Sequence, residues 1–136
     1  MKTNEVLISY LKDIIQGYKI KAEYSTNDTD LKVIVVQETD GPKTVLWNGK
    51  HMFDYFSINI FGNSIQEQKE TANELNKLIG HTAIKEFETN GKVEKWKLIF
   101  KQVSNAQSID YQDIRRIGYN LTLQTIITKF YEGVKK

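Results

Sequence analysis

The chain has 136 residues, which suffices for one folded domain and leaves no room for a second, so we predict a single domain over residues 1–136. Its formal net charge of +2 argues against a free nucleic-acid binder, whose positive excess is usually larger. Cysteine is absent, which excludes disulfides, thiol catalysis and cysteine-based zinc sites, and fits a reducing cytoplasm.

The first twenty residues carry Glu5, Lys12 and Asp13 among their apolar residues, so they form neither the apolar core of a secretory signal nor a membrane span. Their apolar residues recur at spacings of three and four, which predicts an amphipathic helix capped by Thr3 or Asn4. We therefore expect a protein that is made in the cytoplasm and has no membrane partner.

Two or three strands are expected next. Residues 21–30 suggest a short extended piece and a loop. The run Val-Ile-Val-Val at 33–36 is typical of a central strand that is covered on both faces. After a turn at Asn48-Gly49, residues 52–61 alternate, which puts three apolar side chains on one face of a strand: Phe56, Ile58 and Ile60.

The second half begins with a capping box, in which Ser64 caps a helix and Glu67 reaches back to its amide. We expect this helix to end near Ile79, which would point inward, and Gly80 to end it. Asn90-Gly91 then predicts a tight turn between strands at 82–88 and 93–103.

Residues 104–113 are predicted to form a polar loop, and the alternation from 117 to about 128 predicts a long last strand. The expected fold is α+β, with two helices packed on one face of a mainly antiparallel sheet of about five to six strands. The predicted order of elements is α-β-β-α-β-β-β.

The sequence offers little for catalysis. The two histidines, His51 and His81, have no second ligand at metal spacing. Glu67, Glu70 and Glu74 recur at helical spacing beside lysines, which is typical of a solvated helix face. Phosphate-binding loops and nucleophile elbows are absent from the sequence. We therefore predict a protein that is not an enzyme, with no catalytic residue, metal site or cofactor.

Four lysines, Lys92, Lys95, Lys97 and Lys101, lie along the second hairpin strand and suggest a nucleic-acid surface. By parity, however, Trp96 falls on the opposite face, which removes the stacking platform of single-strand binders. Lysines on a strand also guard a sheet edge against pairing with other chains, and we favour this interpretation.

The first candidate interface with a subunit or partner surrounds the Asn48-Gly49 turn. Its residues are aromatic or polar-aromatic, which suits a protein interface: Trp47, His51, Phe53 and Tyr55. The alternative is that these side chains fold back onto the core.

The second candidate interface is the polar segment before the last strand, with Tyr111, Asp113, Arg115 and Arg116. Loops that are held between strands often carry contacts. The alternative is an ordinary connection, with both arginines paired to nearby carboxylates.

Two stretches resemble a known family. Residues 55–62, Tyr-Phe-Ser-Ile-Asn-Ile-Phe-Gly, with the capped helix that ends Glu-Leu-Asn-Lys-Leu-Ile-Gly at 74–80, resemble the middle of tail-terminator and minor capsid proteins of siphophages that infect Gram-positive bacteria. Residues 111–121, Tyr-Gln-Asp-Ile-Arg-Arg-Ile-Gly-Tyr-Asn-Leu, look like the polar loop and long final strand of those proteins. The leading helix and the length match too, so the resemblance covers essentially the whole chain.

The resemblance implies a structural virion protein at the head-tail joint. Such subunits close into a hexameric ring that caps the tail tube and meets the head connector or stopper protein, while DNA passes through without being read. No chemical motif transfers residue by residue, so only the two candidate interfaces above are carried over. Two alternatives stay open: another connector or stopper protein of the same joint, and a nucleic-acid-binding module that uses the lysine face. A small enzyme or ligand-binding domain ranks behind them, because it would need a deep pocket with perturbed titratable groups.

Overall fold

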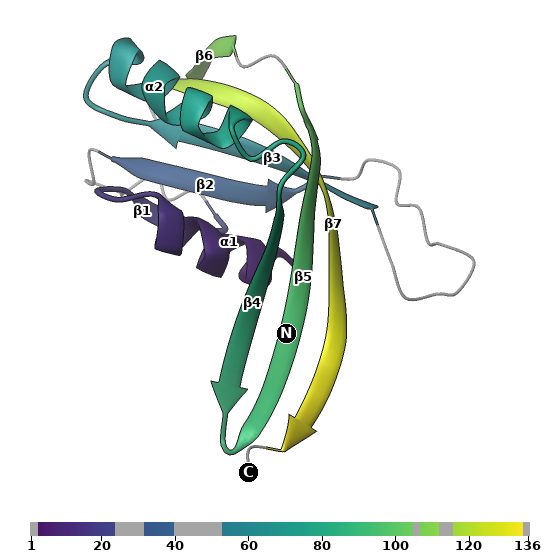
Figure 1. The fold of residues 1–136 in the computed structure, drawn as a ribbon. Helices are drawn as coiled ribbons and strands as arrows, with labels where there is room; N and C mark the ends of the chain where they lie inside the picture. The colour runs from purple at the N-terminus through teal and green to yellow at the C-terminus, as the bar shows by residue number, and fades with distance from the viewer. Residues whose placement is uncertain (1–2, 24–31, 40–52, 105–106, 112–115, 135–136) are drawn as a thin grey trace.

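The computed structural model describes residues 3–23, 32–39, 53–104, 107–111 and 116–134. Within these residues the chain forms two helices and seven strands (Figure 1). The helices are α1 (Thr3–Ile14) and α2 (Ile65–Asn76), and the strands are β1 (Lys19–Lys21), β2 (Val33–Glu38), β3 (Phe53–Phe61), β4 (Thr82–Thr89), β5 (Lys92–Val103), β6 (Gln107–Tyr111) and β7 (Arg116–Val134).

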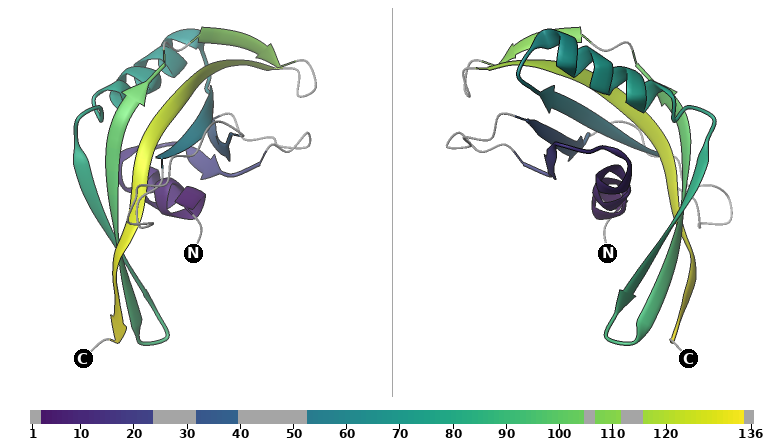
Figure 2. Two further views of the ribbon diagram at one scale, coloured as in Figure 1. Left: turned by 90° about the vertical axis from the view of Figure 1, so that its right-hand side faces the viewer. Right: turned by 60° about the vertical axis from the view of Figure 1, so that its left-hand side comes forward.

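All seven strands belong to one sheet, in the order β1-β2-β3-β7-β5-β4, with β6 also paired to β7. Only the β1–β2 pair is parallel among the described strands. The sheet curls around the helices like half of a barrel (Figure 2). The α+β class and the mainly antiparallel sheet are therefore as predicted, but the sheet has seven strands rather than five to six.

The predicted order α-β-β-α-β-β-β lacks two of these seven strands, β1 and β6. Strand β6 lies in the segment that was predicted to be a polar loop. Its residues have little strand preference of their own. They pair with the start of β7 over five positions, from Gln107 opposite Asn120 to Tyr111 opposite Arg116. Pairing with a neighbouring strand, which local sequence does not reveal, decides the conformation here.

Both helices lie on the concave face of the sheet and share one hydrophobic core with it. The predicted inward face of β3 is confirmed, because Phe56, Ile58 and Ile60 are fully buried in this core. The helices contribute buried apolar side chains from one stripe each: Val6, Leu7 and Leu11 from α1, and Ala72, Leu75 and Leu78 from α2.

Strand β2 is buried on both faces, as its four β-branched residues predict. Ile34 and Val36 belong to the main core. Val33 and Val35 point the other way and form a second buried cluster with Phe61. A strand in the interior of a sheet with both faces covered accommodates such a continuous apolar run.

The predicted cap of α2 is present, with one difference. The Ser64 hydroxyl accepts a hydrogen bond from the Glu67 amide at 3.2 Å. The Glu67 carboxylate accepts from the amide of Asn63, at 3.1 Å, and not from that of Ser64. Two of the amides at the start of the helix are still satisfied by side chains.

Helix α2 ends at Asn76, one turn before the predicted end. Gly80 has a positive φ of 82°, and its amide donates to the carbonyl oxygen of Phe100 at 2.9 Å. This hydrogen bond joins the chain to β5 directly after the helix. Ile79 was predicted to point inward, but it is 43% exposed, because it lies in the turn that leads to β4.

The hairpin of β4 and β5 closes at Asn90 and Gly91, whose φ angles of 52° and 78° are those of the predicted tight turn. Strand β7 continues past the predicted end near residue 128, because it pairs with β5 as far as Lys92 opposite Val134. Strand β4, residues 92–99 of β5 and residues 126–134 of β7 form a three-stranded ribbon, the arm, which extends beyond the helices (Figures 1 and 2).

Candidate assembly surfaces

The arm presents two sheet edges. Strand β3 pairs with β7 only as far as Phe53 opposite Ile126. Within the described residues, no strand pairs with the outer edge of β7 from Lys129 to Val134, and none pairs with the outer edge of β4. An edge of this kind offers unpaired backbone amides and carbonyls to another strand.

Large apolar side chains are exposed along the same arm. Phe130 is 51% exposed, Tyr131 46%, Val134 73%, and Ile84 on β4 65%. Single exposed apolar residues are common on soluble proteins, but a group of them on one projecting element is typical of a contact surface.

The Tyr131 ring lies along the surface of the arm, over the backbone of Gly133. A Cβ atom on Gly133 would lie only 2.8 Å from the Cζ atom of Tyr131, so the ring occupies the space that a side chain at Gly133 would take. The ammonium of Lys95 lies 5.2 Å from the centroid of the same ring.

The concave face of the arm carries a charged network. The Lys129 ammonium lies 3.1 Å from the Glu132 carboxylate and 3.7 Å from that of Glu94. The hydrogen bond from Lys129 to Glu132 is the main reason that the pKa of Lys129 is raised. The indole of Trp96 donates to Glu94 at 3.3 Å. These contacts tie β5 to β7 near the free end of the arm.

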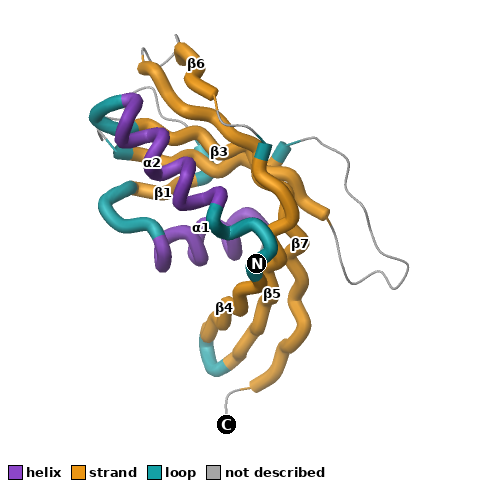
Figure 3. Tube along the Cα trace, turned by 45° about the horizontal axis from the view of Figure 1, so that its top comes forward, coloured by secondary structure: helices purple, strands orange, loops and turns teal. Residues whose placement is uncertain are grey.

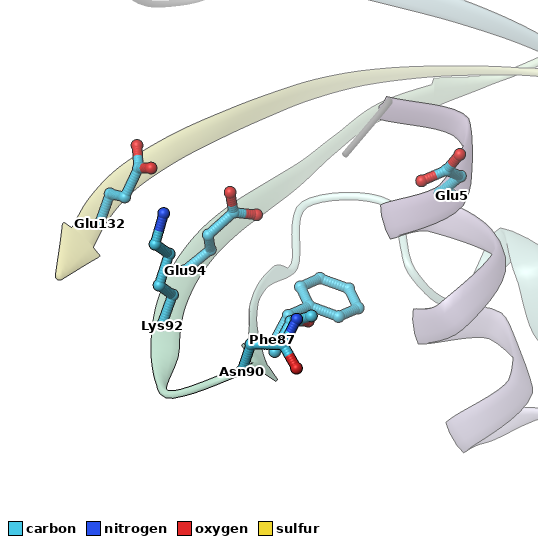
Figure 4. A pocket seen from close by; sticks show the side chains of 7 residues that line it. Glu5, Phe87, Asn90, Lys92, Glu94 and Glu132 are labelled. Atoms are coloured by element: carbon cyan, nitrogen blue, oxygen red, sulfur yellow. The ribbon is translucent and has the colours of Figure 1, made fainter. Parts of the chain in front are cut away.

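A hollow of about 390 Å³ lies beside this network (Figure 4). Lys92, Glu94 and Glu132 line it from the arm, and Glu5 lines it from α1. Lys92 was grouped with the other lysines of β5, but it lies on the concave side, because even-numbered residues of β5 share the face of Trp96.

The remaining lysines of β5 lie on the opposite, convex face, as alternation predicts. Lys97 and Lys101 are exposed, whereas Trp96 is 7% exposed on the core side. Lys97 and Lys101 therefore do not share a surface with the Trp96 ring, whereas the Lys129 ammonium lies over that ring, 5.8 Å from its centroid.

The first predicted interface lies partly outside the described residues, since Trp47 and His51 fall in the segment 40–52. Phe53 begins β3 opposite Ile126. The Tyr55 hydroxyl accepts a hydrogen bond from the Gln124 side chain at 2.9 Å, which holds the half-buried tyrosine against the outer face of the sheet.

In the second predicted interface, Asp113 and Arg115 lie outside the described residues. Tyr111 and Arg116 are the last pair of positions in the β6–β7 hairpin. Phe53 pairs with Ile126 of β7, and Tyr111 pairs with Arg116 of the same strand. These two positions on β7 are ten residues apart, a length of about 33 Å along a strand. The described residues of the two predicted regions therefore lie at different places along β7.

His81, the one histidine that the structure describes, is exposed just before β4. Its backbone amide and carbonyl bond to Leu78 and Phe100. In the described part of the chain, no group of three or more His, Asp or Glu side chains is arranged to hold a metal ion. No helix there has the length and apolar content needed to cross a membrane.

The sequence analysis misses the strand end from Lys129 to Val134, because it expects the last strand to end near residue 128. The length of β5 is the signal that could have found it, because a twelve-residue strand needs a partner of similar length. Comparison with protein-family models, with curated proteins and with solved structures finds no match to this chain.

Proposed function

We propose that this chain is a structural virion protein of a long-tailed bacteriophage: a tail terminator whose subunits form a hexameric ring at the head-tail joint. One observation carries the proposal. The arm projects from the body with two outer edges that no described strand covers, and it exposes Phe130, Tyr131 and Val134 beside one of them.

A ring requires head-to-tail contacts, in which one surface of a subunit meets a different surface of the next. The two edges of the arm differ, since one belongs to β4 and the other to β7. Pairing of unlike edges would continue the sheet from one subunit to the next through main-chain hydrogen bonds, and the exposed apolar residues would be buried at the junction.

The charge of the chain supports a ring through which DNA moves. Each phosphate that a protein neutralises adds to affinity for DNA, so a strongly basic channel would retain it. The net charge here is only +2. The ring would cap the tail tube and meet the connector or stopper protein without reading the DNA sequence.

The test is the mass of the protein in solution over a wide concentration range, with negative-stain images and a capping assay on purified tail tubes. We expect rings of defined subunit number, and we expect Phe130→Glu to weaken their association at least roughly tenfold, as burial of a charge in an apolar contact would. Ile117→Glu is the matched control, because Ile117 is 53% exposed on β7 but far from the arm.

A chain that stays monomeric at every concentration and leaves tail tubes uncapped would overturn the proposal. Rings that bind the connector but not the tube would favour a stopper protein. Binding of DNA that weakens steeply with salt, and depends on Lys97 and Lys101, would favour the nucleic-acid-binding alternative.

A further inference from the structure

A groove of about 510 Å³ lies between the end of α1 and the side of α2 from Glu67 to Glu74, and Figure 3 shows the two helices on the same side of the sheet. Its α1 wall is apolar, with Ile14 42% exposed and Ile15 half-buried. Its α2 wall is acidic, with Glu67, Glu70 and Glu74. The groove therefore combines an apolar and a negatively charged wall.

The floor of the groove is fixed by side-chain contacts. The Thr71 hydroxyl donates to the Tyr18 hydroxyl at 3.0 Å, and the Lys32 ammonium lies 4.8 Å from the centroid of the Tyr18 ring. Burial is the main cause that raises the pKa of Tyr18 above its ordinary value of 10.0. The hydroxyl therefore adds no charge to the groove. Lys32 also lies 3.8 Å from the Glu67 carboxylate.

The groove keeps a negative surplus. Among its lining residues, three carboxylates face the single ammonium of Lys32. Glu74 pairs with Lys77 at 2.9 Å, but both side chains are more than 60% exposed, so this pair contributes little and exchanges readily. An occupant that offers cations beside an apolar side chain would match both walls.

Such a surface exists on the convex face of β4 and β5: Ile84, Lys97 and Lys101, here called the basic patch. Ile84 is 65% exposed and lies opposite Lys97 in the β4–β5 pair. Four residues of strand place Lys97 and Lys101 about 13 Å apart. Seven residues of helix place Glu67 and Glu74 about 10.5 Å apart, so the two charge spacings are comparable.

We propose that the groove between α1 and α2 binds the basic patch of a second copy of this chain. Within one chain the two surfaces cannot meet, because the helices cover the concave face of the sheet and the basic patch lies on the convex face. The contact is therefore head-to-tail, as a ring requires. This inference rests on the proposed ring and identifies a second contact within it, besides the strand edges.

The test uses the full chain, with one half of the sample labelled with ¹⁵N and a carbodiimide that joins carboxylates to lysines in direct contact. We expect cross-links from Glu70 or Glu74 to Lys97 or Lys101, in mixed-isotope products that prove contact between copies. Reversal of the groove (Glu70→Lys with Glu74→Lys) or of the patch (Lys97→Glu with Lys101→Glu) should weaken association at least roughly tenfold. Association is the readout for these variants, because they no longer carry the groups that the carbodiimide joins.

Mixing the two variants provides the decisive control. Each variant alone presents like charges on both surfaces, whereas in the mixture every groove meets a patch of opposite sign, so association should return to near the wild-type level. The substituted side chains are exposed, and unchanged thermal unfolding would verify that both variants fold.

The outcomes separate this inference from the proposed function. Rings without the groove-to-patch cross-links, or rings that survive charge reversal, would overturn the groove contact and leave the ring standing. Cross-links in a sample that forms only open chains would support the contact and count against the ring. If groove reversal blocks capping of tail tubes but not self-association, the occupant is the tube protein and the inference is wrong.

Discussion

Gly62 joins β3 to α2 at a point where a side chain would collide with the cap of the helix. A Cβ atom there would lie 2.7 Å from a carboxylate oxygen of Glu67 and 3.1 Å from the Tyr18 hydroxyl. We predict that Gly62→Ala displaces the Glu67 carboxylate, because this flexible group moves more easily than the tyrosine, whose hydroxyl is bonded to Thr71. The hydrogen bond from the Asn63 amide to Glu67 would then be lost.

Gly62→Ala changes the free energy of unfolding through two opposing effects, the loss of a capping interaction and a less flexible unfolded chain. Loss of a capping interaction costs about 1 kcal/mol of unfolding free energy. The Lys32–Glu67 pair adds little, since both side chains are about a third exposed and the separation is 3.8 Å. Replacement of glycine by alanine also removes freedom from the unfolded chain, which stabilises by about 0.4–1 kcal/mol. The single substitution can therefore have a small net effect.

A double-mutant cycle with Glu67→Ala isolates the clash, because the unfolded-state term cancels. Urea denaturation of the four proteins should give a coupling energy of about 1 kcal/mol between positions 62 and 67. The matched control is Ser64→Ala, which removes the other cap bond but not an atom near Gly62, and should be additive with Gly62→Ala. A coupling between 62 and 67 below about 0.3 kcal/mol would refute the reasoning.

Two further predictions concern the core and the groove. Phe100→Ala should cost about 3–5 kcal/mol in urea denaturation, because the ring is fully buried and packs 5.6 Å from that of Tyr10; a loss below about 1.5 kcal/mol would contradict the core described above. In a titration followed by tyrosinate absorbance, one tyrosine should ionise above its ordinary pKa of 10.0, and Tyr18→Phe should remove that late step. Because the folded-state pKa of Tyr18 is raised, the unfolded chain loses this proton at lower pH than the folded chain. The free energy of unfolding of the wild type should therefore fall as pH rises through 10, and that of Tyr18→Phe should fall less. An equal fall in both proteins would contradict this prediction.

The sequence alone determined the features that depend on residues close together in the chain. Asn90 and Gly91 form the tight turn because both tolerate a positive φ. Ser64 caps α2 because its hydroxyl reaches an amide three residues on. The alternation of β3 and the apolar stripes of the helices also depend only on local spacing. The structure confirms the alternation and most of each stripe, but Ile14 and Ile79 at the ends of the stripes are exposed.

Tertiary structure decided what depends on partners that are distant in sequence. Strand β6 exists because β7 offers it an edge, and β7 reaches Val134 because β5 is there to pair with it. Neither segment has a local pattern strong enough to predict this.

In the candidate contact surfaces, too, some features follow from the sequence and others only from the fold. Alternation predicts that Lys97 and Trp96 lie on opposite faces of β5. The groove could not be predicted, because Glu67 and Glu70 have the spacing of an ordinary solvated helix face. Only the packing of α1 beside α2 turns that face into one wall of a groove, with Ile14 on the other wall. Spacing along a helix says which side chains share a face, and the fold alone decides what that face meets.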